Sequence, residues 1–390
     1  MKEQARGTIR ATVLVVGGAL AVAFVIESLR PTQAMPVFAQ AYGINCEVCH
    51  SSVPLLNAYG RYVQRTGYSS LDASVVHAAN PFWLSEALFY DSQDSSEPHQ
   101  VQTGNLSLHG AGYIGSDITF HLHQWIQQND QPGGTDTVWL TYNNLLHRDG
   151  HLTIGKLELP APSPFSQTFE LSGYNPPSMT VGEHAYGLSS NRWGAKFQYI
   201  RPGYIVEAAY VTSDANLNTA FDFSGMSDKT FQYRVAYARP DKPLEFGAYG
   251  ATGSFPLSDG TFDAYSTIAP YLQIDSQHGI PGLFALYQLN NDANAGPGFG
   301  PAHSKGYSID VFEPLYKDAV MLGLRSEMTD DGLGTVTHYG NIDLGIVLSR
   351  HVSPSAATAW VLNGEAGLVN GSIPAWRAQL QFNTTIGHLR

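Results

Sequence analysis

Apolar and polar residues alternate with a period of two from about Pro81 to the C-terminus. Successive side chains of a β-strand point to opposite faces, so this period predicts strands that have one apolar and one polar face. Aromatic residues gather near the ends of these segments. The pattern predicts sixteen strands, near residues 83–91, 101–114, 117–127, 136–146, 151–158, 191–200, 204–213, 230–238, 244–254, 262–274, 282–290, 306–312, 318–328, 336–349, 355–363 and 373–387.

The connections between these strands alternate between short and long. Short turns are expected at Gly115-Ser116, 148–150, 201–203, 239–243, 277–279 and Glu313-Pro314, and longer loops near 92–100, 128–136, 159–190, 214–229, 255–261, 291–305, 328–335 and 364–372. Bacterial outer-membrane barrels alternate periplasmic turns with extracellular loops in this way, and their strand number is even. We therefore expect residues 83–390 to form an all-β transmembrane antiparallel barrel of about sixteen strands, with periplasmic termini. A soluble β-sandwich or propeller is the alternative, although no repeat of blade length is visible.

Residues 1–34 have the features of a signal peptide. Lys2, Arg6 and Arg10 precede an apolar run from Ala11 to Ile26, and Thr32-Gln33-Ala34 supplies small residues for cleavage. An uncleaved anchor is the alternative, but the run is shorter than the ~20 residues that span a bilayer. We expect cleavage near Ala34 and export.

The exported chain is acidic. Without residues 1–34 it carries 17 Lys and Arg against 31 Asp and Glu, a net charge of about −14. Such a surface disfavours nucleic acid as a partner and raises the local concentration of cations.

Cys46-Glu47-Val48-Cys49-His50 matches the Cys-x-x-Cys-His pattern to which c-type haem is attached. Each thiol can add to one vinyl group of the porphyrin, and the imidazole of His50 reaches the iron. A disulfide, a redox dithiol or half a zinc site are the alternatives. These are the only two cysteines in the chain, so no second pair exists to complete a structural zinc centre. The motif predicts one covalently attached haem c.

Residues 35–82 are expected to form a small haem domain. Apolar residues recur at roughly helical spacing from Val53 to Val63, which predicts a short helix that packs against a porphyrin face or against protein. So short a segment buries too little surface to fold unaided, whereas a sixteen-stranded barrel encloses a lumen. If the domain lies in the lumen as a plug, the barrel interior supplies the surface against which its side chains can be buried. It also places the haem where one centre can connect the two sides of an outer membrane.

Residues 36–68 resemble the fused outer-membrane cytochrome-porins, whose best-known members oxidise iron(II). The resemblance rests on Pro36-Val37-Phe38-Ala39, Tyr42-Gly43, the Cys-x-x-Cys-His motif, Pro54, Leu56-Asn57, Tyr59-Gly60 and Gly67-Tyr68. The chain departs from the family at Gln40-Ala41 and at Tyr59, where Phe is common. The resemblance implies a sixteen-stranded barrel and inward electron flow from an extracellular reductant.

His50 is the predicted proximal ligand of the haem iron, and His77 is the first choice for the sixth ligand. His77 lies between the predicted helix and the first strand, and the family places a histidine before the residue that corresponds to Pro81. A second imidazole suits electron transfer, and a methionine raises the potential. The competing candidates are His121, His123, Met179 and His184.

The longest loop, 159–190, either folds inward to narrow the channel or lies on the surface. Pro160, Pro162, Pro164, Pro176 and Pro177 stiffen it, and Glu170, Glu183 and His184 are candidate entrance residues. Asp91, Asp94, Glu97 and His99 form a second acidic cluster, either a solvated loop tip or an antechamber for cations. No tight iron(II) site is predicted, because outer-sphere oxidation requires only transient binding.

The leading hypothesis is an electron-transfer protein, similar to an iron(II):cytochrome c oxidoreductase. It takes electrons from extracellular Fe(II) or another reductant and passes them to a periplasmic cytochrome c or cupredoxin. One alternative is electron export to an extracellular acceptor. The other is a porin or receptor whose haem plug is structural.

Overall fold

The computed structural model describes residues 35–77, 80–92, 100–128, 131–162, 171–213, 229–277, 279–316, 319–353 and 356–386. The expected signal peptide, Asp94, Glu97, His99 and Glu170 lie outside these ranges. Within them, no helix combines the length and the apolar character that a bilayer crossing requires.

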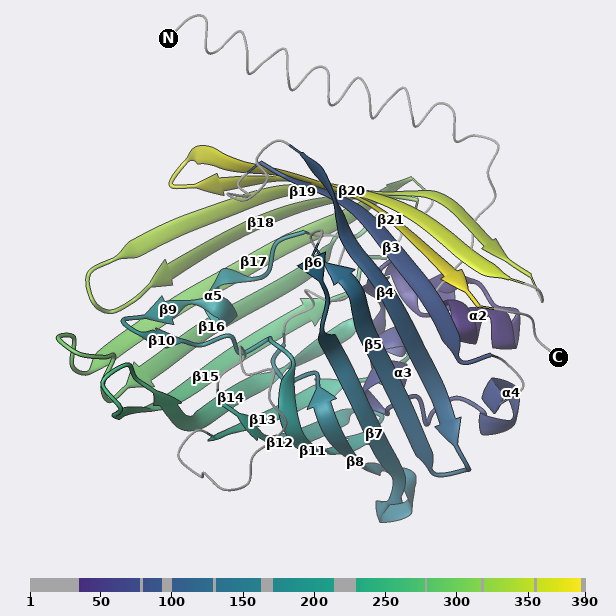
Figure 1. Ribbon diagram of the computed structural model, residues 1–390, viewed down its shortest axis with the longest axis horizontal. Helices are drawn as coiled ribbons and strands as arrows, with labels where there is room; N and C mark the ends of the chain where they lie inside the picture. The colour runs from purple at the N-terminus through teal and green to yellow at the C-terminus, as the bar shows by residue number, and fades with distance from the viewer. Residues whose placement is uncertain are drawn as a thin grey trace, which may run out of the picture.

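Sixteen long antiparallel strands close into a single ring in the described part of the chain (Figure 1). The first and last strands, β3 and β21, pair with each other, and β8 pairs with β11 across the long loop. The short β6 (Gln131–Pro132) extends β5. The sixteen are β3 (Phe82–Asp91), β4 (Val101–Ile114), β5 (Ile118–Gln128), β7 (Thr135–Leu145), β8 (Gly150–Leu157), β11 (Arg192–Arg201), β12 (Tyr204–Thr212), β13 (Lys229–Ala238), β14 (Leu244–Pro256), β15 (Phe262–Ile274), β16 (Gly282–Asp292), β17 (Ala302–Tyr316), β18 (Val320–Asp330), β19 (Val336–Val352), β20 (Ala357–Val369) and β21 (Ser372–Thr385).

Every predicted strand corresponds to one of these, but the predicted long loop at 364–372 was wrong. β20 and β21 continue to Val369 and from Ser372, and only Asn370 and Gly371 connect them. Both residues have positive φ, of 49° and 80°. Asn-Gly is the dipeptide that a two-residue type I′ hairpin turn requires, so the alternation of short and long ends fails at this position.

The barrel wall is apolar outside and polar inside. In β13, Phe231, Tyr233 and Val235 are 43%, 38% and 57% exposed, whereas the residues between them, Gln232 and Arg234, are buried. This is the reverse of a water-soluble β-protein, in which apolar side chains fill the interior. Two inserted segments fill much of the polar interior.

The first insert is residues 35–77, called here the N-terminal segment. Its side chains contact β5 through Tyr68, β14 through Arg65 and β19 through Glu47. These strands are spaced about a third of the ring apart, so the segment lies inside the ring, near the short turns (Figure 1). It comprises α2 (Pro36–Tyr42), the 3₁₀ turn η2 (Cys46–Val48), β1 (His50–Ser52), β2 (Leu55–Leu56), α3 (Ala58–Arg65) and α4 (Ala73–His77).

The predicted helix over 53–63 begins later than expected. Leu55 and Leu56 pair with β1 instead, and Asn57 caps α3, where its Oδ1 accepts a hydrogen bond of 3.0 Å from Gly60 N. An asparagine side chain is a strong N-cap because it satisfies a free N–H of the first turn. Leu55 then packs on Phe312 and Met321 of the wall.

The second insert is residues 171–190, called here the loop segment. It contains α5 (Asn175–Ser178), β9 (Thr180–Val181) and β10 (His184–Ala185). Tyr174 donates to Asp310 on β17, and Asn175 donates to Glu327 on β18. The described part of the loop therefore folds inward, and it lies toward the long-loop end, away from the N-terminal segment (Figure 1).

Candidate functional site

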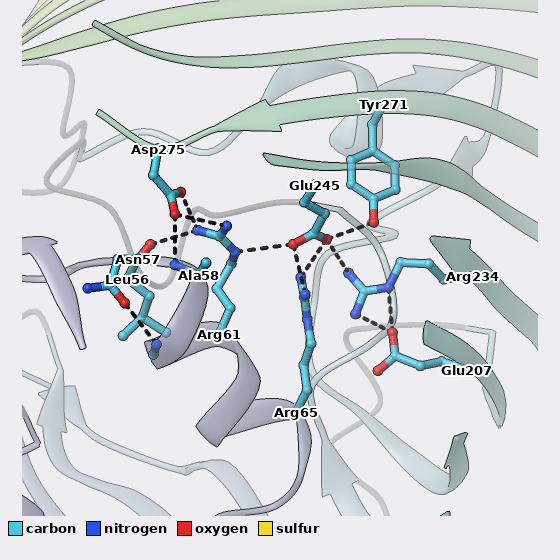
Figure 2. Close-up of polar contacts among 11 residues, drawn as sticks. Leu56, Asn57, Ala58, Arg61, Arg65, Glu207, Arg234, Glu245, Tyr271 and Asp275 are labelled. Atoms are coloured by element: carbon cyan, nitrogen blue, oxygen red, sulfur yellow. Dashed lines mark hydrogen bonds and ion pairs between the residues drawn. The ribbon is translucent and has the colours of Figure 1, made fainter. Parts of the chain in front are cut away.

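Two arginines of α3 fix the N-terminal segment to the barrel wall (Figure 2). Arg61 donates to both oxygens of Asp275, at 2.7 and 3.3 Å, and its Nε donates to Glu245 Oε2 at 3.2 Å. Arg65 donates to both oxygens of Glu245, at 2.8 Å each. The paired guanidinium and carboxylate geometry is the strong form of this contact.

The network continues into the wall. Tyr271 donates to Glu245 Oε1 at 2.8 Å, and Arg234 pairs with Glu207 beside it. Asp275 also accepts a hydrogen bond of 2.7 Å from the backbone N–H of Ala58, at the start of α3. Removing one partner from such a buried set leaves an uncompensated charge and costs about 3–5 kcal/mol. The orientation of α3 is therefore fixed from both its start and its end.

The Cys-x-x-Cys-His motif spans η2 and the start of β1, in the chain that precedes α3. Cys46 is fully buried and Cys49 half-buried, and both thiols are free. His50 Nδ1 donates to the carbonyl of Pro54 at 2.8 Å. That hydrogen bond assigns the proton to Nδ1, so Nε2 carries the lone pair with which an imidazole binds a metal.

Gly60 allows α3 to pack directly under the motif. A Cβ at this position would lie 2.1 Å from the carbonyl oxygen of Cys49. Asn57 holds the same loop, because its backbone N–H donates to Cys49 O at 3.0 Å and its side chain donates to Glu47 O at 3.1 Å. Asn57 and Gly60 thus have a structural reason: they hold the motif against the helix.

The thiol environment disfavours a redox dithiol. Burial raises the pKa of Cys46 and raises that of Cys49 to about 11. Catalytic Cys-x-x-Cys thiols instead need a lowered pKa, which produces the reactive thiolate. Burial also lowers the pKa of His50 to about 4, which keeps its ring neutral. A neutral imidazole is the form that binds iron.

A cavity of about 1260 Å³ opens beside the motif, lined by the N-terminal segment, by the loop segment and by strands around the ring. Its lining includes Cys49 and His50, and apolar side chains of the N-terminal segment lie beside them: Phe38, Tyr42, Leu56, Tyr59 and Val63. Ligand sites are typically ~300–1,000 Å³ and largely apolar, so the space suits a large planar group. The Cys49 thiol and the prepared imidazole of His50 border this space and Cys46 is buried next to them in the motif, and these groups together with the apolar surface fit a c-type haem.

Three wall histidines line the same cavity as His50: His109 on β4, and His121 and His123 on β5. The His109 and His123 rings stack at 4.0 Å, and Trp83 stacks on His109 at 4.9 Å. Tyr68 contacts His121 Nδ1 at 2.8 Å, and His123 Nδ1 lies 2.9 Å from Asp136 Oδ2. A carboxylate on Nδ1 leaves Nε2 as the metal-binding atom, as in many metal sites.

The structure does not bring His77 together with His50. His77 is exposed at the end of α4, and its Nε2 donates to the carbonyl of Gly115 at 2.9 Å. Met179 and His184 are buried in the loop segment, where Met179 Sδ accepts from Asn290 and His184 contacts Asp263 and Asp292. None of the three lines the cavity. Of the predicted candidates for the sixth ligand, His121 and His123 do.

Other predicted site residues have structural roles. Glu183 accepts hydrogen bonds from Ser258, at 2.9 and 2.7 Å, on a neighbouring loop, and Asp91 pairs with Arg377 at 2.9 Å. Sequence reasoning missed His109 and the arginines of α3. His109 could have been found, because its position in β4 places it on the same face as the polar residues that alternate there. The carboxylate partners of Arg61 lie more than 180 residues away and left no local signal.

Solved porins have the same fold as this chain. An anion-selective porin from Comamonas acidovorans superimposes with a TM-score of 0.51 at 15% identity, over 78% of this chain and 98% of that one. OmpTdeltaL8, a loop deletion mutant of an outer-membrane protein of Vibrio cholerae, gives 0.50 at 11% identity, over 77% and 97%. At such identities the likeness concerns the fold. No protein-family model and no curated protein matches the sequence.

Proposed function

We propose that this protein carries electrons across an outer membrane through one haem c, attached at Cys46 and Cys49 and ligated by His50 inside the barrel. The observation that carries the proposal is the position of the Cys-x-x-Cys-His motif within the ring of strands, beside the cavity. The outward apolar face of the strands supports a lipid environment. A haem bound there supplies a one-electron carrier partway between the two ends of the barrel.

The chain's own residues hold and insulate this centre. The arginine pairs of α3 fix the motif relative to the wall, and Phe38, Tyr59 and Val63 exclude water from the cavity on one side. Lys156 and Lys196, which also line the cavity, donate to backbone carbonyls at 2.6 and 3.0 Å. Their charges suit the carboxylates of haem propionates.

His123 is the proposed sixth ligand, in place of His77. The contact of its Nδ1 with Asp136 leaves the lone pair of Nε2 free to bind iron. The Pro54 carbonyl has the same effect on His50. His109 stacks on the face of His123 and fixes the plane of the ring. Two imidazoles favour a low-spin iron suited to electron transfer.

Extracellular Fe(II) is the proposed reductant, and a periplasmic cytochrome c or cupredoxin is the proposed acceptor. The net negative charge of the chain attracts cations and so favours encounter with Fe(II). Each Fe(II) that becomes Fe(III) gives up one electron, and each reduced carrier takes one away. Electron export uses the same path in reverse, because potentials set the direction of flow.

The test is reduction of the purified, haem-loaded protein by ferrous iron in a stopped-flow instrument. We expect the haem absorption to shift to the reduced form within seconds at micromolar protein. Ascorbate serves as a control reductant that shows the haem to be competent. A haem that ascorbate reduces and Fe(II) does not would contradict Fe(II) as donor and favour export or another reductant.

A porin whose haem segment is structural is the second candidate, and the similarity to porins favours it. Planar-bilayer conductance distinguishes the two. Because both inserts occupy the lumen, the electron-transfer proposal expects a conductance well below that of an open sixteen-stranded pore. A full porin conductance together with a redox-inert haem would favour the porin.

A further inference from the structure

His184, Asp263 and Asp292 meet where the loop segment touches the barrel wall. His184 belongs to β10, whereas Asp263 is the second residue of β15 and Asp292 is the last residue of β16. His184 Nδ1 lies 2.9 Å from Asp263 Oδ2 and 2.8 Å from Asp292 Oδ1. The three side chains are at most 1% exposed.

One ring N–H faces two carboxylate oxygens in this cluster, and a single proton cannot fully satisfy both. Among the described residues, no hydrogen-bond donor reaches the second oxygen of Asp292, Oδ2. No lysine or arginine of the described chain forms an ion pair with either aspartate. The carboxyl groups of Asp263 and Asp292 also contact each other and face a single imidazole, so either a shared proton or a bound cation is needed to balance their charge in a dry site.

We propose that this cluster binds a first-row divalent cation, with His184 Nδ1 and one oxygen each of Asp263 and Asp292 as protein ligands. One candidate donor atom from each residue lies within 4.8 Å of the others. Bonds of ~2.0–2.2 Å place neighbouring donors about 3.0–3.4 Å apart, and the distances of 2.9 and 2.8 Å from His184 Nδ1 to the two carboxylate oxygens are within a few tenths of an ångström of that separation. One imidazole and two carboxylates suit Mn²⁺, Fe²⁺, Co²⁺ or Zn²⁺.

The surroundings already orient the donors. Tyr186 donates to Asp292 Oδ1 at 2.7 Å, and the backbone N–H of Asn294 donates to Asp263 Oδ1 at 2.9 Å. The ring of His184 is stacked between Tyr186 at 4.0 Å and Phe255 at 4.6 Å. Outer contacts of this kind fix the direction of a ligand and raise metal affinity.

The turn between β9 and β10 brings the histidine to the wall. Gly182 has a φ of 60°, and a Cβ there would lie 2.0 Å from the carbonyl oxygen of Ala295. Glu183 N donates to that same carbonyl at 2.8 Å. A bound cation would therefore join the loop segment, β15 and β16 at one point and hold the loop inside the barrel.

The test uses the full-length, haem-loaded protein in detergent, stripped with EDTA and titrated with Mn²⁺. Free Mn²⁺ is followed by its six-line EPR signal. We expect one Mn²⁺ per chain, and nitrogen coupling in the pulsed EPR spectrum from the imidazole. Asp292→Asn and Asp263→Asn should each weaken binding more than ~100-fold, and Tyr186→Phe by ~10–100-fold, the usual cost of losing an outer contact.

Asp259→Asn is the matched control, because Asp259 is exposed on the nearby loop and only caps Thr261. It should leave Mn²⁺ binding unchanged. Wild-type protein that binds no Mn²⁺ would overturn the proposal and leave a shared proton as the explanation. Binding that both aspartate variants retain, or that shows no nitrogen coupling, would also overturn it. The measurement requires no electron transfer, so it is independent of the proposed function.

Discussion

The two inserts of the barrel are held by opposite kinds of contact. The N-terminal segment sends arginines to wall carboxylates, so Arg61 and Arg65 neutralise Asp275 and Glu245. The loop segment sends mostly neutral donors, such as Tyr174 and Asn175, to carboxylates of β17 and β18. The N-terminal segment therefore neutralises the wall carboxylates that it contacts, whereas the loop segment only donates hydrogen bonds to them.

The two inserts also differ in how closely they pack against the wall. The N-terminal segment leaves a cavity of about 1260 Å³ lined by His50 and by wall histidines. The loop segment packs Tyr174, Val181 and Tyr186 against the wall until they are almost fully buried. The comparison teaches that the N-terminal segment borders space for a large group, whereas the side chains of the loop segment are closely packed against the wall.

Replacing both motif cysteines should have the largest effect. In Cys46→Ala/Cys49→Ala no thiol remains to form a thioether, so covalent haem should be lost completely. Haem staining of a denaturing gel measures this, and heat-modifiable migration of the barrel checks its folding. Haem that stays on the denatured variant would break the assignment of the cavity to a c-type haem.

Replacing His123 should change the haem iron from low-spin to high-spin. His123→Gln removes the proposed sixth imidazole, and magnetic circular dichroism reports the ligand set directly. His77→Gln is the control, because His77 is exposed and contacts the Gly115 carbonyl. The opposite result, a change in His77→Gln alone, would restore His77 as the ligand.

Replacing Glu245 should loosen the N-terminal segment by about 3–5 kcal/mol, because Arg61, Arg65 and Arg234 then lose their shared buried carboxylate. Glu245→Gln is measured by protease cleavage within residues 35–77 as denaturant rises. Asp241→Asn is the control, since Asp241 pairs with Arg239 at an exposed turn, where solvent screens the pair and little stability is lost. Equal protection in the two variants would show that the ion pairs do not hold the insert.

Adding a methyl group at Gly60 should have the smallest of these effects, about 1–3 kcal/mol, the usual cost of overpacking. The new Cβ overlaps the Cys49 carbonyl and pushes the motif away from α3. Haem occupancy and the denaturation midpoint of Gly60→Ala should both fall. In the control Gly364→Ala the added methyl comes no closer than 4.0 Å to other atoms, so both values should stay unchanged.

The barrel could be predicted from the sequence because its information is local. Each strand repeats the same alternation, and turn residues mark each connection. An error such as the loop predicted at 364–372 therefore affects only the ends of the two strands that it joins. Asn370-Gly371 shows that the tight turn was readable from its dipeptide. The inward fold of the 159–190 loop was one of two alternatives that the sequence left open.

The site could be predicted only where its residues are neighbours in sequence. Cys46, Cys49 and His50 lie within five residues, and the motif defines them. The wall histidines come from two strands whose register alone sets His109 opposite His123. His77 was favoured because it lies between the predicted helix and the first strand and because the resembling family places a histidine there, but it does not line the cavity. A position along the chain does not show which side chains face a lumen.

The pairing of β21 with β3 has a consequence for biogenesis. The N-terminal segment directly precedes β3, and contacts to strands around the whole ring enclose it. If a porphyrin is attached to this segment, we expect the attachment to precede the joining of the barrel's final seam, because the closed ring of strands surrounds the segment that carries the cysteines. Maturation would then follow a fixed order: the haem is attached first, the strands fold around it, and β21 pairs with β3 last.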